Sequence, residues 1–104
     1  MNLAKLREAL DKGSIEWEKH ALERLISRSI PRYAVLQILR LGECIEDYPD
    51  DHPFPSGLFF GWHQDKPLHV VAALDETARL VYIITTYEPD QEHFEADYKT
   101  RRKK

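Results

Sequence analysis

The sequence predicts an α+β fold in which about three N-terminal helices pack on one face of a four-stranded antiparallel meander, with a short C-terminal helix. Two observations lead to this fold class. Apolar residues recur at helical spacing over the first 41 residues, whereas the strongest β-prone runs all follow residue 42. The connections between those runs are short, and short connections join antiparallel neighbours.

The helical part divides into three segments that are separated by helix-ending residues. The first segment, residues 3–10, repeats leucine and alanine at helical spacing and ends before Gly13. The second covers Glu18 to about Ser27. Ser29 caps the third, which ends at Gly42. Three short helices are therefore expected in the first 41 residues.

The rest of the chain alternates β-prone runs with turn residues. Four strands are expected, at Glu43–Tyr48, Leu58–His63, Leu68–Leu74 and Leu80–Tyr87. The last two lack a clean alternation of polar and apolar residues, so we expect them to be central and covered on both faces. After Pro89, residues 90–99 are expected to form the short C-terminal helix.

Length and composition indicate one domain over residues 1–104, with its core at about 15–100 and a basic tail at 101–104. The chain has no apolar run long enough to span a bilayer and no export signal, so we expect a cytoplasmic protein without a membrane partner. Its lone cysteine, Cys44, excludes an intrachain disulfide and a cysteine-rich metal cage.

The net charge of −3 hides an uneven distribution. Residues 19–40 carry five cations and one acid, residues 99–104 carry five cations, and residues 43–51 carry five acids. Recognition depends on the local patch, so the average charge does not exclude a polyanionic partner. The alternative interpretation is a solvated helix face followed by a frayed tail.

The stretch KHALERLISR, residues 19–28, concentrates this charge on one predicted helix face. His20, Arg24 and Arg28 are spaced four apart and therefore form one stripe. An apolar stripe of Ala21, Leu22, Leu25 and Ile26 lies beside it. A cationic edge next to an apolar anchor suits a phosphate-binding site, and it is equally typical of an ordinary amphipathic helix with solvated arginines.

The five histidines do not show the spacing of a metal site. The sequence has no HxxxH, HExxH or CxxC pair, and we expect neither a metal nor a cofactor. What remains is acid–base chemistry centred on His20 and His69. Tyr87, which closes the last strand, is a candidate proton donor. The alternatives are a hydrogen-bonded histidine at a strand end and a tyrosine of the core or its rim.

Four segments together carry a family resemblance. They are KHALERLISRSIPRYAVLQIL, EDYPDDHPFPSGLFFGW, PLHVVAAL and VYIITTYEPDQEHFEADYKTRR. They resemble a bacterial domain-of-unknown-function family whose members carry an H-A-x-x-R-x-x-x-R helix, a p-l-H-V-V strand and a terminal T-x-Y-x-P. That family looks like a relative of the RelE-type and BrnT-type toxins, which are small α+β ribonucleases of toxin–antitoxin systems.

The resemblance implies a metal-independent endoribonuclease that acts on RNA. His20 would be the base or acid, and Arg24 and Arg28 would clamp the phosphate. His69 or Tyr87 would be the complementary proton carrier. The chain departs from such enzymes in lacking a sheet face dense in lysine and arginine.

The same resemblance implies that Arg101 and Arg102 add affinity for the RNA backbone. The acids of residues 43–51 would repel RNA. Nothing in the sequence predicts DNA as a partner.

A non-catalytic interaction module is the competing hypothesis. Alternate residues of a strand point to opposite sides, so Phe59, Phe60 and Trp62 cannot all face one core. One of those faces would then bind an antitoxin-like protein. A third hypothesis is a structural domain without a ligand, which forms a homodimer.

Overall fold

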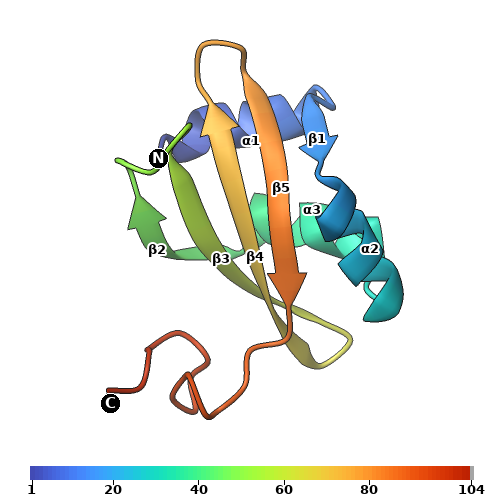
Figure 1. The fold of residues 1–104 in the computed structure, drawn as a ribbon, viewed down its shortest axis with the longest axis vertical. Helices are drawn as coiled ribbons and strands as arrows, with labels where there is room; N and C mark the ends of the chain where they lie inside the picture. Colours follow the sequence, from blue (N-terminus) through green and yellow to red (C-terminus); the bar gives the residue numbers. More distant parts are fainter. Residues whose placement is uncertain (104) are drawn as a thin grey trace.

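The protein, seen here in a computed structural model that describes residues 1–103, combines three helices with one five-stranded sheet (Figure 1). The helices are α1 (Leu3–Asp11), α2 (Lys19–Ser27) and α3 (Arg32–Leu41). The strands are β1 (Ile15–Trp17), β2 (Glu43–Tyr48), β3 (Ser56–His63), β4 (Lys66–Asp75) and β5 (Leu80–Tyr87).

The sheet is mixed, with the strand order β1-β5-β4-β3-β2. Strands β2 to β5 are antiparallel neighbours, but β1 adds a parallel strand that pairs Ile15 with Val81. The predicted four-stranded antiparallel meander is therefore wrong. Because β1 also separates α1 from α2, the helices do not form one uninterrupted N-terminal block. A strand of three residues whose partner lies far along the chain leaves only a weak local signal.

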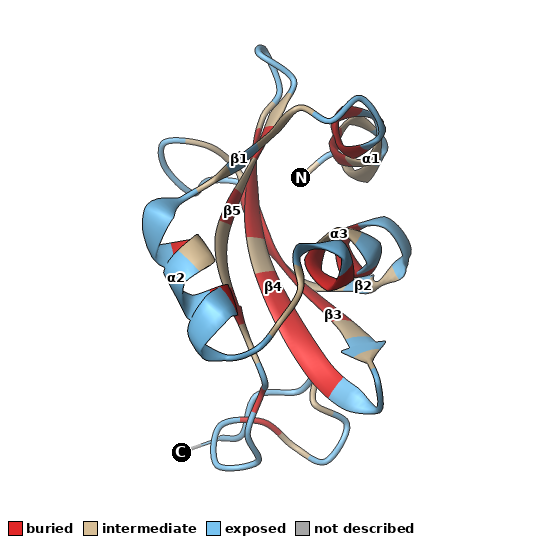
Figure 2. Cartoon of the chain, turned by 90° about the vertical axis from the view of Figure 1, so that its right-hand side faces the viewer, coloured by how far each residue is buried: buried red, intermediate tan, exposed pale blue. Residues whose placement is uncertain are grey.

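The helices do not all cover the same face of the sheet. Helices α1 and α3 lie together on one face, whereas α2 lies beside β5, away from them (Figure 2). At the end of β1, the backbone N–H of Glu18 donates to the carbonyl of Ile83, and α2 then runs along β5. The helix thus covers the edge of β5 that the short β1 leaves unpaired.

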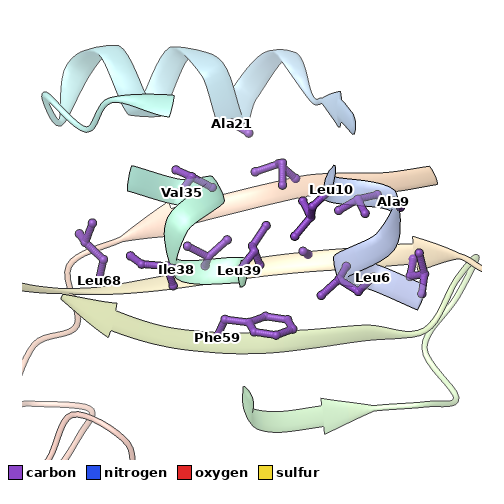
Figure 3. Packing of buried hydrophobic residues seen from close by; sticks show 14 of the residues in the cluster. Leu6, Ala9, Leu10, Ala21, Val35, Ile38, Leu39, Phe59 and Leu68 are labelled. Atoms are coloured by element: carbon purple, nitrogen blue, oxygen red, sulfur yellow. The ribbon is translucent and has the colours of Figure 1, made fainter. Parts of the chain in front are cut away.

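The hydrophobic core lies mainly between the sheet and the helices α1 and α3, and Ala21 and Leu25 of α2 belong to the same cluster (Figure 3). Leu6 and Leu10 of α1 and Leu39 of α3 are buried against Phe59 of β3 and Ile83 of β5. Strand β4 contributes alternate residues to this cluster, namely Leu68, Val70, Ala72 and Leu74. This alternation places His69 on the opposite face of the sheet.

The segment after β5 folds back against that opposite face without forming the predicted C-terminal helix. Side chains there bond to nearby backbone N–H groups, which favours turns over a helix. Asp90 accepts from the backbone of Glu92 and His93, and Asp97 accepts from the backbone of Thr100. The hydrogen bonds that Asp97 accepts from the backbone of Thr100 and Lys99 lower its pKa to about 2. The segment instead holds Phe94 against the sheet.

Within residues 1–103, none of the helices has the length and hydrophobicity of a membrane-spanning segment.

Candidate functional site

The predicted stripe of His20, Arg24 and Arg28 runs along the outside of α2 beside β5. His20 is 81 % exposed, and its Nδ1 lies 3.5 Å from a carboxylate oxygen of Glu23. Arg28, at the end of the helix, donates from Nη1 to the carbonyl of Thr86 at 2.6 Å. The far end of the stripe is thereby fixed to the end of β5, whereas His20 remains on an open surface.

Arg28 forms part of the wall of a pocket of about 570 Å³. Three separate segments meet there: the α2–α3 connection, the β3–β4 hairpin and the chain at the end of β5 (Figure 1). The lining residues with polar or titratable side chains are Arg28, Ser29, His63, Gln64, Lys66, Tyr87, Glu88 and Asp90. Cations, carboxylates and an imidazole therefore share one concave site.

The β3–β4 hairpin places His63 and Lys66 side by side in this pocket. The two residues are cross-strand partners, so their side chains leave the same face of the hairpin. Between them, Gln64 and Asp65 both have left-handed backbones, with φ of 48° and 65°. This is the geometry of the tight two-residue turn whose twist matches that of the flanking strands. The ring of Tyr33 on α3 meets His63 edge-on at 5.5 Å between centroids.

His69 is fully buried beneath the C-terminal segment. Its Nε2 lies 2.6 Å from the carbonyl oxygen of Tyr98, which can only accept, so Nε2 carries the proton. Its Nδ1 lies 3.2 Å from the hydroxyl of Tyr87, which donates to it. Burial lowers the pKa of His69, despite the opposing effects of the Tyr98 hydrogen bond and of Glu46. The imidazole is therefore a neutral, fully hydrogen-bonded group without a path to solvent.

An ion pair on the same face of the sheet secures the C-terminal segment. Arg101 donates twice to the carboxylate of Glu46, at 2.7 and 3.0 Å, and Tyr48 donates to the same carboxylate. Burial opposes ionisation of Glu46, but the hydrogen bonds from Arg101 and Tyr48 outweigh it and lower the pKa of Glu46. Burial also raises the pKa of Tyr87.

The two predicted RNA-binding arginines of the tail are both engaged within the chain. Arg101 is paired with Glu46, and Arg102 donates to the carbonyl of Gln91 and, at 3.0 Å, to Glu95. Lys104, the last residue of the predicted basic tail, lies outside the described residues.

The structure brings together some of the predicted site residues and separates others. His69 and Tyr87 are in contact, and Arg28 and Tyr87 line the same pocket. Arg24 lies 3.5 Å from the Thr85 hydroxyl, and neither it nor His20 lines the pocket. The catalytic roles given to His20, His69 and Tyr87 stay predictions.

Sequence reasoning missed His63, Lys66 and Glu88. The sequence predicts a turn at residues 64–67, between the strands Leu58–His63 and Leu68–Leu74, which places Lys66 inside the turn. In the structure β4 begins at Lys66, so the two residues that flank the shorter turn leave the same face. Which face meets Arg28 depends on the packing of α2 against β5, which has no signature in the sequence.

One group of exposed side chains offers metal-ligand atoms. Asp90, Glu92 and His93 present ligand atoms within 4.8 Å of one another. The carboxylate of Asp90 already lies 2.8 Å from Nδ1 of His93 and accepts two backbone N–H groups. These contacts account for the clustering without an ion.

The comparisons with known proteins give one match. The family described as "Domain of unknown function (DUF4258)" matches residues 17–88, from the last residue of β1 to the residue after β5. No curated protein and no solved structure matches the chain significantly. The matched region includes Arg28, His63, Lys66 and Glu88, and it stops short of Arg101 and Arg102. Since the match covers more than half of the sequence, the chain belongs to the DUF4258 family of domains.

Proposed function

We propose that this protein is a metal-independent endoribonuclease related to the RelE-type and BrnT-type toxins, and that it cleaves RNA in the pocket beside Arg28. The observation that carries the proposal is the convergence of Arg28, Lys66 and His63 in one pocket. Its volume of about 570 Å³ falls within the range of small-ligand sites. An RNA substrate makes the cytoplasm the compartment in which the protein would act.

The cations of the pocket would hold the scissile phosphate. One terminal nitrogen of Arg28 is bound to Thr86, which fixes the direction of the guanidinium and leaves its other N–H groups for phosphate oxygens. Lys66 would add a second positive charge from the hairpin. Both would stabilise the negative charge that builds up on the phosphorus centre during attack.

Two titratable groups of the pocket would move the protons. In the reaction, Glu88 accepts the proton of the ribose 2′-hydroxyl while the 2′-oxygen bonds to phosphorus. The bond from phosphorus to the 5′-oxygen breaks, and His63 gives that oxygen a proton. The products are a 2′,3′-cyclic phosphate and a free 5′-hydroxyl. Carboxylate and imidazole suit this exchange at neutral pH.

The predicted residues outside the pocket would serve it indirectly. Arg24 extends the cationic surface from Arg28 along α2 toward the exposed His20, and a second phosphate of the RNA would lie there. His69 holds Tyr87, whose neighbour Glu88 is the proposed base. Because His69 is buried and hydrogen-bonded on both nitrogens, the proposal gives it a positioning role.

Cleavage of a labelled RNA by the purified protein in EDTA is the first test. We expect His63→Gln to slow cleavage on the order of 100-fold, the usual contribution of one proton carrier. Lys66→Gln is expected to slow it about 10-fold, less than a buried donor would, because Lys66 lies at an exposed rim. Lys12→Gln removes the same charge at the end of α1 and should leave the rate unchanged.

Mass spectrometry of the products would show the cyclic phosphate. A folded protein that leaves RNA uncut at equimolar concentration would contradict the proposal, as would a His63→Gln variant that cleaves at the rate of the unsubstituted chain.

A groove at the other end of α3 favours a second candidate function, that of an interaction module for an antitoxin-like protein. The groove, of about 420 Å³, is lined by Leu41 and Trp62, whose surfaces are 79 % and 57 % exposed. Its cation, Lys99, is paired with Glu43 at 2.9 Å. An apolar surface with a neutralised charge suits an apolar helix of a partner better than RNA.

This second function predicts a stable complex with a small protein encoded beside this chain. Leu41→Asp combined with Trp62→Asp should weaken that complex at least 100-fold, because both changes place charges in a desolvated interface. Isothermal titration with the two purified proteins measures the change. An equal affinity of the double variant would exclude the groove as the binding surface.

A further inference from the structure

We propose that Tyr33 is a base-stacking platform next to the pocket, so that the site accepts an unpaired nucleotide and rejects paired RNA. The inference rests on the proposed function for the identity of the polymer. It adds a residue that lies outside the pocket lining and a selectivity for single strands.

The position of Tyr33 supports this role. Its ring lies at the start of α3, is 60 % exposed, and touches His63 of the pocket edge-on, with 5.5 Å between centroids and 75° between planes. An edge-on contact with one neighbouring ring covers at most one face of the tyrosine, and the residue is 60 % exposed, so aromatic surface remains for a flat ligand. A base that follows or precedes the phosphate in the pocket therefore meets an aromatic surface one ring away.

The charges around Tyr33 suit a nucleic acid strand. Arg28 and Lys66 lie in the adjoining pocket, and Arg32 precedes Tyr33 in the chain, with its guanidinium 5.5 Å from the centre of the Trp17 ring. The acids that line the pocket are Glu88, which the proposed reaction uses, and Asp90, whose carboxylate is bound to His93. Asp65 lies in the turn between His63 and Lys66 and does not line the pocket. An aromatic surface flanked by cations is the usual arrangement for binding single strands.

Geometry explains the selectivity. A base inside a duplex is stacked on both faces, so it cannot also lie on Tyr33 without leaving the helix. An unpaired base makes the contact freely. The hydroxyl of Tyr33 plays no part in stacking, so phenylalanine should replace tyrosine without loss.

Binding is tested apart from cleavage with a single-stranded oligoribonucleotide whose 2′-hydroxyls are methylated and which therefore cannot be cut. Fluorescence anisotropy of the labelled oligonucleotide should show Tyr33→Ala weakening the affinity about 10-fold, within the range for loss of one stacked base. Tyr33→Phe should bind as the unsubstituted chain does. A fully paired, blunt-ended RNA duplex of the same length should bind more weakly and respond equally little to both variants.

Equal single-strand affinity of Tyr33→Ala and the unsubstituted chain overturns the inference, even if Lys66→Gln slows RNA cleavage as expected. Tighter binding of the duplex than of the single strand also overturns it. Conversely, a Tyr33-dependent preference for single strands in a protein that cuts no RNA supports the platform and contradicts the endonuclease.

Discussion

Replacing His69 with alanine is expected to lower the free energy of unfolding by about 3 kcal/mol. The substitution leaves a cavity in a fully buried site and strips two hydrogen bonds, one to the hydroxyl of Tyr87 and one to the carbonyl of Tyr98. Urea unfolding monitored by tryptophan fluorescence measures the change. His20→Ala is the matched control, because His20 is 81 % exposed and its loss should cost less than about 0.5 kcal/mol.

The His69→Ala variant also shows how much of the pH dependence of the unfolding free energy comes from His69. Burial lowers the pKa of His69, so the unfolded chain takes up a proton at a higher pH than the folded chain does. The contribution of His69 to stability is therefore complete above the unfolded pKa of about 6.5 and is lost as the pH falls further. Unfolding curves from pH 8 to pH 5 should show this loss in the unsubstituted chain and a shallower one in His69→Ala. Parallel pH profiles would contradict the buried, neutral state of His69.

Replacing Gly42 with alanine is expected to destabilise the fold by about 3 kcal/mol, because the protein has no room for a side chain there. Gly42 joins α3 to β2, and a Cβ at this position would lie 2.5 Å from the carbonyl oxygens of both Ile38 and Phe60. Both obstacles are backbone atoms, so relief requires α3 to move away from β3. Thermal unfolding followed by circular dichroism would show the loss.

Gly13 offers the contrasting case for this measurement. Its φ of +72° disfavours a side chain, but a Cβ there meets no atom within 4 Å. Gly13→Ala should therefore cost about 1 kcal/mol from backbone strain alone. If the two alanine variants were equally stable, the close approach of α3 to β3 at Gly42 would be excluded as the cause.

Local sequence signals predicted the individual elements well and their assembly poorly. The strands Glu43–Tyr48 and Leu80–Tyr87 have the predicted bounds, since turn residues mark both ends of each. The parallel pairing of β1 with β5 was missed because it depends on residues far apart in the chain. The predicted C-terminal helix was wrong because Asp97, inside the predicted segment, accepts the backbone N–H of Lys99, which a helix would pair with a carbonyl.

In the candidate site, too, features within one element could be predicted from the sequence, whereas contacts between elements could not. The spacing of Arg24 and Arg28 on one helix face could be read from the sequence, and so could the alternation that places His69 opposite the core. That Arg28 faces His63 and Lys66 could not be read, because the α2–α3 connection and the β3–β4 hairpin meet only through tertiary packing. Nor does the sequence reveal that Tyr98 covers His69, because that contact spans 29 residues.

The parallel pairing of β1 has a consequence for how the protein is made. During synthesis, Ile15 leaves the ribosome 66 residues before Val81, the partner with which it pairs. Until then β1 has no strand to bind, and α2 has no β5 along which to lie. The closing of the sheet is therefore a late, long-range event that links the beginning of the chain to its last strand.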